Sequence, residues 1–372
     1  MPQPRKKIII SGGGTGGHIF PAVAIADALK RRLEEPDILF IGAKGRMEME
    51  KVPASGYKIE GLWISGIQRK LTLKNLSFPF KLISSMLKAR RIIKRFKPDV
   101  AIGTGGYASG PMLRVASRKG IPCLIQEQNS FPGITNRILS KTVDTICVAF
   151  EGMGKYFPAE RMVLTGNPVR QEIIDMADKK EEAINFFKLQ PGIKTILVIG
   201  GSQGARSVNQ ALSKILEQIV DQQVQMIWQC GVSFYETARA LVKELPQDKA
   251  QRIMVMDFIS RMDLAFAASD VVISRAGAIA ISELCIAARP CLLVPLPSAA
   301  EDHQTKNAQA LVAKGAAIMI SDNKLDDDLL PALTSLLADE EKQKEMSTNI
   351  RKLARPEATE EIADEVIKLL DR

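Results

Sequence analysis

"KKIIISGGGTGGHIFPAVAIADAL", residues Lys6 to Leu29, decides the fold class of this chain. A β-branched run is followed by five glycines and a threonine, and then by a stretch with helical periodicity. A strand, a glycine turn and a helix in this order open a βαβ unit, and the free N–H groups of such a turn favour an anion. The stretch therefore predicts an open, parallel α/β sheet with an anion-binding turn at its carboxyl edge.

The spacing Gly12-x-Gly14-x-x-Gly17 also fits the dinucleotide fingerprint of dehydrogenases. That fingerprint requires an acidic residue at the end of the second strand, where it holds the ribose. Here Asp37 begins the second strand and Ala43-Lys44-Gly45 ends it. The P-loop pattern G-x-x-x-x-G-K-[ST] does not occur either. The sequence thus favours neither a dehydrogenase nor a P-loop nucleotidase.

The same rhythm starts again at "KTILVIGGSQGA", Lys194 to Ala205. Helical stretches are expected at Ala22–Arg32, Val208–Ile219 and Ala278–Ala287. Short apolar and β-branched runs predict the strands. They are Lys7–Ile10, Ile38–Ile41, Val100–Ile102, Cys123–Ile125, Thr145–Val148, Met162–Leu164, Thr195–Ile199, Gln225–Trp228, Ile253–Val255, Val271–Ser274 and Cys291–Val294.

Two doubly wound domains in tandem follow from the repeated rhythm. The polar segment Gly166–Gly192 has no strand signal and forms the linker zone, and an acidic helix beyond Arg355-Pro356 could pack back on the first domain. We therefore expect one domain from residues 1–167 plus 355–372 and another from residues 168–354. Ligands bind such sheets at the carboxyl ends of the strands, so the glycine turns should face an interdomain cleft.

The composition is that of a soluble globular protein, with 46% hydrophobic and 25% charged residues. No apolar run reaches the roughly 18 residues of a membrane span. The N-terminal apolar run, Ile8–Ile10, is too short for a signal peptide, so we expect a cytoplasmic protein. Five cysteines without C-x-x-C spacing indicate buried hydrophobic side chains rather than disulfides or a zinc site.

The charge is unevenly distributed. Met1 to Thr165 holds 27 Lys and Arg against 12 Asp and Glu, whereas the remainder holds 24 against 30. The segment Ser65–Pro98 contains ten Lys and Arg and no acid, with aromatic residues around Phe78-Pro79-Phe80. Basic and apolar residues interleaved in this way suit an anionic membrane surface. Part of the segment must simply pack on the sheet, and no nucleic-acid motif accompanies the charge.

Three glycine turns share one design: Gly12–His18, Gly103–Pro111 and Gly200–Ala205. Each follows an expected strand and precedes an expected helix, so each is either a tight βα turn or an anion site. Three such turns at the same kind of edge favour ligand binding.

These motifs resemble those of the MurG family of bacterial peptidoglycan glycosyltransferases. The stretches that carry the resemblance run in order from near residue 7 to beyond residue 310. They are "SGGGTGGHIFPAVAIADAL", "GTGGYASGP", "QEQNSFPGITNRILSK", "GNPVR", "GGSQGARSVN" and "SRAGAIAISELCIAARPCLLVP" followed by "HQTKNAQAL". The resemblance implies a GT-B fold with two Rossmann-like domains and an inverting transfer of GlcNAc from UDP-GlcNAc. The acceptor implied is the 4-hydroxyl of MurNAc in undecaprenyl-diphospho-MurNAc-pentapeptide, which converts lipid I into lipid II.

On the donor side, the resemblance assigns roles that physical chemistry explains. Ser202 and Arg170 would hold the diphosphate, and Ile259 would contact uracil. Glu283 would accept the ribose hydroxyls, and Gln304 would bond the transferred sugar. The resemblance adds to the UDP-GlcNAc site Thr15, Gly16, Gly17, Asn129, Ala278, Ile279, Ala280, Ile281 and Ser282.

On the acceptor side, the first two turns would hold the lipid diphosphate through Gly13, Gly14, Gly105 and Gly106. His18 is a candidate general base because imidazole titrates near neutral pH, or else it only binds phosphate or carbonyl oxygens. Glu127 is the rival base, and Tyr107 is a further catalytic candidate that could position a sugar.

Several expectations about partners complete this interpretation. We expect UDP-GlcNAc, the undecaprenyl-linked acceptor and an anionic membrane at Ser65–Pro98 as partners, with other cell-wall enzymes as further candidates, and no nucleic acid. The protein would be peripheral on the cytoplasmic face of the inner membrane. No cofactor and no metal are expected, since Asp326-Asp327-Asp328 fits a helix N-terminus better than a metal-chelating D-x-D motif. The alternatives are a UDP-GlcNAc epimerase of the same architecture and a non-enzymatic basic scaffold.

Overall fold

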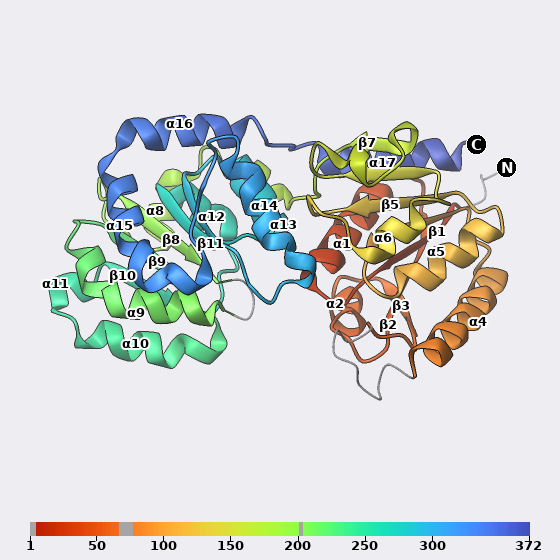
Figure 1. Ribbon diagram of the computed structural model, residues 1–372, viewed down its shortest axis with the longest axis horizontal. Coiled ribbons are helices and arrows are strands. Elements are labelled where there is room, and N and C mark those ends of the chain that lie inside the picture. Colours follow the sequence, from red (N-terminus) through yellow and green to blue (C-terminus); the bar gives the residue numbers. More distant parts are fainter. Residues whose placement is uncertain (1–4, 67–76, 201–203) are drawn as a thin grey trace. The chain divides into compact units, whose positions relative to one another are not determined.

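The computed structural model describes residues 5–66, 77–200 and 204–372. It divides into two compact units, Met1–Val169 with Pro356–Arg372 and Arg170–Arg355 (Figure 1). The boundaries expected from the sequence lie within two residues of these limits. Each unit contains one parallel sheet with its own core.

The first unit contains a seven-stranded sheet in which every pairing is parallel. The strand order places β1 beside β4, so the order reverses between these two strands, as in a Rossmann fold. Across the sheet the strands are β3 (Lys58–Leu62), β2 (Asp37–Ala43), β1 (Lys7–Gly12), β4 (Val100–Gly105), β5 (Cys123–Glu127), β6 (Thr145–Val148) and β7 (Met162–Leu164).

Helices cover both faces of this sheet, because alternate strand residues point to opposite sides. Ile9 and Ile41 belong to the core cluster that contains residues of α4 and α5, whereas Ile8 and Phe40 belong to the cluster with α1 and α17. The helices are α1 (Gly16–Arg32), α2 (Glu48–Ala54), α4 (Phe78–Phe96), α5 (Ser109–Arg118), α6 (Ile134–Leu139) and α17 (Ala358–Leu370).

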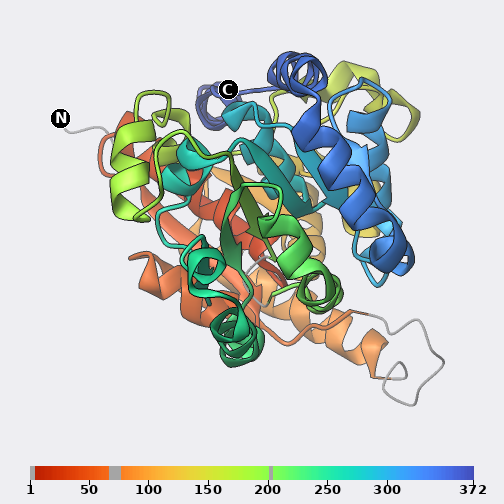
Figure 2. The same cartoon turned by 90° about the vertical axis from the view of Figure 1, so that its left-hand side faces the viewer.

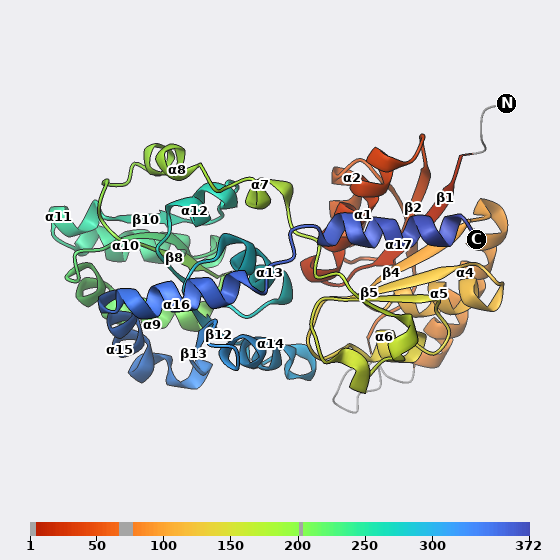
Figure 3. The same ribbon diagram turned by 90° about the horizontal axis from the view of Figure 1, so that it is seen from above.

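The final helix packs on the first unit, as the sequence suggested. Helix α17 runs alongside α1 (Figure 3), with Ile362 and Val366 fully buried in their shared core. Arg31 and Arg32 of α1 form ion pairs with Glu360 of α17. The acidic face of α17 thus meets basic residues at the C-terminal end of α1, where a helix dipole favours cations.

The second unit contains a six-stranded sheet that is also entirely parallel. Its order reverses between β8 and β11, so both units have the same topological switch. Figures 1 and 2 show this unit from two sides. Across the sheet the strands are β10 (Ile253–Met256), β9 (Gln225–Gln229), β8 (Thr195–Ile199), β11 (Val271–Arg275), β12 (Cys291–Val294) and β13 (Ile318–Met319).

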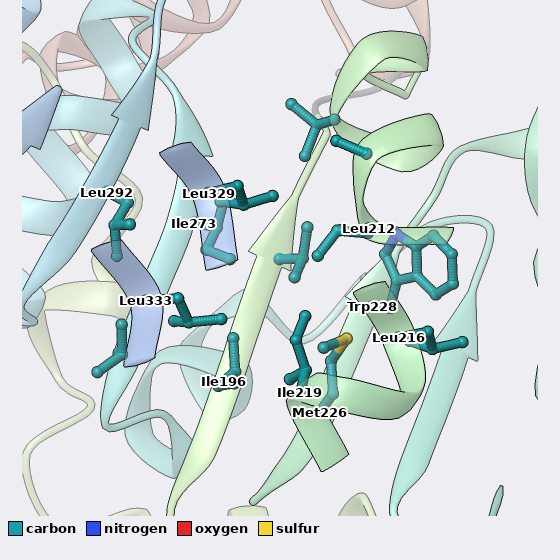
Figure 4. Packing of buried hydrophobic residues seen from close by; sticks show 14 of the residues in the cluster. Ile196, Leu212, Leu216, Ile219, Met226, Trp228, Ile273, Leu292, Leu329 and Leu333 are labelled. Atoms are coloured by element: carbon teal, nitrogen blue, oxygen red, sulfur yellow. The ribbon is translucent and has the colours of Figure 1, made fainter. Parts of the chain in front are cut away.

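One face of this second sheet forms a large apolar core with two amphipathic helices. Trp228 of β9 and Ile196 of β8 pack with Leu212 of α9 and with Leu329 and Leu333 of α15 (Figure 4). The helices of this unit are α7 (Gln171–Ile174), α8 (Lys180–Phe186), α9 (Arg206–Val220), α10 (Tyr235–Glu244), α11 (Gln247–Ala250), α12 (Met262–Ala268), α13 (Ala278–Ala287), α14 (His303–Val312), α15 (Leu325–Ala338) and α16 (Glu340–Arg351).

The eleven strands expected from apolar runs are all present, most of them extended by one to three residues. Two strands were not predicted from the sequence: β3, whose KIEGL stretch has two charged residues and a glycine among its five, and β13, which has only two residues. Asp326–Asp328 lie in the first turn of α15, as expected.

All five cysteines are buried and free, as their spacing predicted. Burial raises the pKa of Cys123 to about 12 and that of Cys230 to about 11, so these thiols are inert packing groups.

Within the described ranges, none of the helices combines the length and apolarity required to cross a lipid bilayer.

Candidate functional site

The glycine turns lie where the strand order reverses. In the first unit, one turn joins β1 to α1 and another joins β4 to α5, and these strands are neighbours at the switch point. In the second unit, β8 leads to α9 and β11 leads to α13 in the same way. Open α/β sheets bind their ligands at such places.

The two turns of the first unit approach each other backbone to backbone. A Cβ atom on Gly106 would lie 2.2 Å from the carbonyl oxygen of Gly13, and Gly106 has a φ of +86°. A Cβ atom on Gly105 would lie 2.7 Å from the ring of His18, at a φ of +101°. Only glycine permits both the backbone conformation and the contact. The predicted phosphate glycines are thus also required for packing the two turns together.

A buried glutamate fastens the first turn. Glu48, at the start of α2, is fully buried and accepts hydrogen bonds from the N–H of Gly14 at 2.9 Å and from that of Ala43 at 2.9 Å. The sequence showed no acid at the end of β2, yet the Glu48 carboxylate occupies that place from five residues downstream. The N–H of Gly14, which we expected to bind a diphosphate, is therefore paired within the protein.

His18 lies in the first turn of α1, half-buried against the second glycine turn. Its Nδ1 lies 3.0 Å from Oε1 of Gln128, and its carbonyl oxygen accepts from Thr104 Oγ1 at 2.8 Å. Burial lowers the pKa of His18 below its ordinary value of 6.5, against opposing contributions from Gln128, the Thr104 backbone and Glu48. His18 is therefore a neutral imidazole at neutral pH.

A chain of buried amides lies behind His18. Gln128 Nε2 donates to the carbonyl oxygen of Thr104 at 2.7 Å and to Oε1 of Gln126. Gln126 Nε2 donates to Asn167 Oδ1 at 2.9 Å, and Asn167 Nδ2 donates to the carbonyl oxygen of Gln128 at 3.0 Å. Gln126, Gln128 and Asn167 are each at most 2% exposed. Low-dielectric surroundings make such a chain rigid as long as its members are satisfied.

Glu127 points into a different environment from His18. Its carboxylate accepts four hydrogen bonds, from Asn129 N and Nδ2 on Oε1 and from Gly133 N and Asn136 Nδ2 on Oε2. The side chain is 2% exposed. Burial raises the pKa of Glu127, while these four donors act in the opposite direction. The carboxylate thus organises the loop after β5, and Asn129 is one of its partners.

The other first-unit candidates lie at the surface of the turns. Thr15 is the residue before α1, and its carbonyl oxygen accepts from His18 N and Ile19 N. Gly17 is exposed and Gly16 is half-buried, both in the first turn of α1. Tyr107 is 48% exposed, and its ring packs against the backbone of Gly66. The structure brings these residues to the same edge as His18.

In the second unit, two residues that we expected to bind the donor substrate contact each other. Arg170 precedes α7, and its Nε and Nη2 lie 3.0 and 2.9 Å from Oε1 of Glu283. Glu283 is buried in the second turn of α13, and burial raises the pKa of its carboxyl group while Arg170 opposes this. Arg170, which we expected to bind a diphosphate, therefore lies beside Glu283, which we expected to bind a ribose.

Helix α13 also positions the run Ala278–Ser282. Ala278 is its first residue, and Ser282 Oγ donates to the Ala278 carbonyl oxygen at 3.0 Å. Ala278 and Ile281 are buried, whereas Ile279 and Ala280 are half-buried. This run therefore offers a ligand the N-terminal turn of α13 and not the buried side chain of Ile281.

The remaining donor candidates differ in their surroundings. Ile259 is 1% exposed, so its side chain belongs to the core, and only its backbone can meet a base. Gln304, in α14, accepts from the backbone N–H of Leu296 at 3.0 Å. Ser202 lies outside the described residues.

Four buried polar residues of the first unit were not predicted from the sequence: Glu48, Gln126, Gln128 and Asn167. The available signal was polar residues at the carboxyl end of an apolar strand, since "QEQN" ends the run Cys123–Ile125. In the second unit, Arg275 was also missed. It ends β11 and donates to Asp322 at 2.5 Å, to Ser207 at 2.7 Å and to the Val294 carbonyl oxygen at 3.2 Å.

Comparison with known proteins agrees with this geometry. Residues 8–148 match the glycosyltransferase family 28 N-terminal domain, and residues 195–362 match its C-terminal domain. The chain is 53% identical over 365 residues to a protein of Flavobacterium psychrophilum, with 98% of each covered. That relative is named UDP-N-acetylglucosamine–N-acetylmuramyl-(pentapeptide) pyrophosphoryl-undecaprenol N-acetylglucosamine transferase.

This chain belongs to the MurG family of glycosyltransferases.

A solved structure of the MurG family has a similar fold. The chain is similar to the crystal structure of MurG from Acinetobacter baumannii, with a TM-score of 0.80, 31% identity and coverage of 98% of this chain and 100% of the other. The two sheets are thus those of a GT-B glycosyltransferase.

The epimerase alternative is not supported. The chain is similar to UDP-GlcNAc 2-epimerase from Neisseria meningitidis at a TM-score of 0.66, with 97% of this chain and 100% of the other covered. Their identity is 15%, so this likeness reports the shared fold alone. The MurG-family chain is a glycosyltransferase.

Proposed function

We propose that this chain transfers GlcNAc from UDP-GlcNAc to the 4-hydroxyl of MurNAc in undecaprenyl-diphospho-MurNAc-pentapeptide, converting lipid I into lipid II. The observation that carries the proposal is the 53% identity, over nearly the whole of both chains, to a relative named for this reaction. Two switch-point sites, one in each unit, agree with a reaction that has two large substrates.

The second unit binds the donor. The N-terminus of α9, after the Gly200–Ala205 turn, favours the diphosphate through its dipole, and Ser202 and Arg170 add to it. Arg170 contacts Oε1 of Glu283 through both Nε and Nη2, and we assign the ribose hydroxyl to Oε2. Gln304 bonds the sugar, the backbone at Ile259 meets uracil, and α13 closes the site with Ala278 to Ser282.

The first unit binds the acceptor and supplies the base. N–H groups of the turns around Gly13, Gly105 and Gly106 hold the lipid diphosphate, except that Gly14 serves Glu48 instead. Thr15, Gly16, Gly17, Tyr107 and Asn129 line the same edge and position the sugars. The neutral ring of His18 accepts the proton, because Glu127 is buried under four hydrogen bonds.

The chemical step then balances without a further reactant. The acceptor 4-hydroxyl oxygen forms a bond to C1 of GlcNAc while its proton passes to His18. The C1–O bond to UDP breaks, and its electron pair leaves with the diphosphate, whose charge the donor site stabilises. Attack from the face opposite UDP inverts C1 and gives a β-linkage. No metal and no cofactor is needed for this step.

Membrane attachment through α4 is part of the proposal. Phe80, Ile83 and Leu87 are 71%, 59% and 48% exposed and recur on one side of the helix. They line a groove together with Lys88, Arg91 and Arg95 among others. An apolar stripe beside cations suits insertion among anionic headgroups. We infer a peripheral enzyme on the cytoplasmic face of the inner membrane, where other cell-wall enzymes are candidate partners and nucleic acid is not.

The transfer is tested with radiolabelled UDP-GlcNAc and a lipid I analogue. We expect label in the lipid product with β-configuration. Binding of UDP-GlcNAc without transfer would overturn the proposed reaction, and conversion of UDP-GlcNAc to UDP-N-acetylmannosamine would support the epimerase instead.

Attachment is tested with a triple variant that replaces Phe80, Ile83 and Leu87 by serine. We expect loss of binding to anionic vesicles with transfer to a water-soluble acceptor retained, since each apolar side chain contributes roughly 1.5–3 kcal/mol when buried. Phe78 is unsuitable because it packs against the core. Replacing the exposed Phe186 and Val232 of the second unit by serine is the matched control.

A further inference from the structure

The hydrogen bonds of the amide chain behind His18 can run from donor to acceptor in only one direction. It begins at Asn167, whose Nδ2 donates to the backbone carbonyl oxygen of Gln128 at 3.0 Å. A carbonyl oxygen can only accept, so Asn167 must turn its own Oδ1 toward Gln126 Nε2, 2.9 Å away. Gln126 must then turn Oε1 toward Gln128.

A second anchor fixes Gln128 independently. Its Nε2 lies 2.7 Å from the backbone carbonyl oxygen of Thr104, which again can only accept. Both anchors therefore require the amide nitrogen of Gln128 to face away from His18. The atom that faces His18 Nδ1, at 3.0 Å, is consequently Oε1, an acceptor.

We propose that Gln128 is a positioning residue that holds His18 in the tautomer with its proton on Nδ1. The inference rests on the proposed function in taking His18 as the base. Nε2, the other ring nitrogen, then carries the lone pair that receives the proton of the acceptor hydroxyl. Both ring nitrogens bear protons after that transfer, and Nδ1–H still donates to Gln128, so the contact is kept throughout the step.

The opposite tautomer would break the chain. With the proton on Nε2, the lone pair of Nδ1 would face the lone pairs of Gln128 Oε1. Rotating the Gln128 amide to relieve this would turn Oε1 toward the Thr104 carbonyl oxygen and toward Gln126 Oε1. Each arrangement leaves buried polar atoms without a partner, in a region where water does not reach.

A neutral partner also suits the task better than a carboxylate. A carboxylate on Nδ1 would favour the imidazolium and keep the base protonated at neutral pH. The charged group that acts on the ring is Glu48, whose carboxylate already bonds Gly14 and Ala43. An amide orients the ring without adding charge, which leaves His18 neutral before the reaction.

The tautomer is read directly by 15N NMR of the full-length protein with labelled histidine. The chain has two histidines, so a spectrum of His18→Gln assigns the signals. Above pH 7 we expect a protonated Nδ1 and an unprotonated Nε2. A protonated Nε2 would overturn the inference, whether or not the protein transfers GlcNAc. Correct tautomer without transfer would instead overturn the proposed function.

Two variants test the positioning role kinetically. Gln128→Met removes the acceptor at similar size, and we expect kcat to fall about 10- to 100-fold, a part of what general-base catalysis contributes, with KM for UDP-GlcNAc unchanged. Gln128→Glu keeps an oxygen on Nδ1 but turns its second oxygen toward the Thr104 carbonyl oxygen, so only part of kcat should be recovered, with the acid limb of the pH profile moved to higher pH. Equal losses in both variants with an unmoved limb would overturn the positioning role.

Discussion

The two candidate sites of this molecule hold their polar groups by different means. Around His18, three neutral amides and two backbone carbonyl groups form a buried chain, and the nearby carboxylates of Glu48 and Glu127 accept hydrogen bonds from N–H donors. In the second unit, Arg170 is paired with Glu283, and Arg275 with Asp322. A base needs a defined tautomer and no added charge, whereas a nucleotide diphosphate needs cations. Under the proposed function, this difference separates a site for proton transfer from a site for an anionic ligand.

The largest expected effect is on the first site. His18→Ala should lower kcat by about 10²–10⁴-fold, the usual contribution of a general base, without changing the Kd for UDP-GlcNAc. Transfer kinetics with a lipid I analogue and calorimetric titration of UDP-GlcNAc measure the two quantities. An unchanged kcat would show that His18 does not act in the chemical step. The proposed difference between the two sites would then be wrong.

The second site should respond in the opposite way. Glu283→Gln should weaken UDP-GlcNAc binding by about 10- to 100-fold, because hydrogen bonds to charged groups contribute about 1.5–3 kcal/mol. Titration calorimetry checks this, with Glu181→Gln as the exposed control on α8. If the variant binds the donor normally but turns over slowly, Glu283 acts in the chemical step and the assignment is wrong.

The smallest expected effect on kcat is that of replacing Glu127, and it distinguishes the role of Glu127 from that of His18. Glu127→Gln places an amide nitrogen among four donors, so we expect a loss of about 1–3 kcal/mol of unfolding free energy and a kcat within a few-fold of wild type. Chemical denaturation and transfer kinetics on the same sample measure both, and Glu160→Gln, on an exposed position, is the control. A stable variant with kcat reduced a hundredfold would make Glu127 the base.

Much of the fold follows from local sequence signals. Buried runs such as Thr195–Ile199 and Cys291–Val294 have the bounds that the sequence predicted, because fully buried parallel strands are almost continuously apolar. The strand β3 was missed because KIEGL lies at a sheet edge with a charged face. A two-residue strand such as β13 leaves no periodic signal at all.

The site was less predictable for a physical reason. Glycine turns are visible as composition, but the direction of the amide chain also depends on contacts between residues as far as 110 positions apart. Gln126 and Gln128 show only that polar residues end an apolar strand. Glu48 reaches the end of β2 from the next helix, so a search for an acid within the strand misses it. Tertiary contacts, not local pattern, decide which polar group meets which.

The pH dependence of kcat tests the central claim most directly, namely that a neutral His18 takes the acceptor proton. Since burial lowers the pKa of His18, the imidazole stays unprotonated at neutral pH and is lost as a base only as the pH falls below 6.5. We predict an acid limb of kcat below pH 6.5 that is present in wild type and in Glu127→Gln and absent from the residual activity of His18→Ala. An acid limb that persists in His18→Ala and disappears in Glu127→Gln would contradict the account.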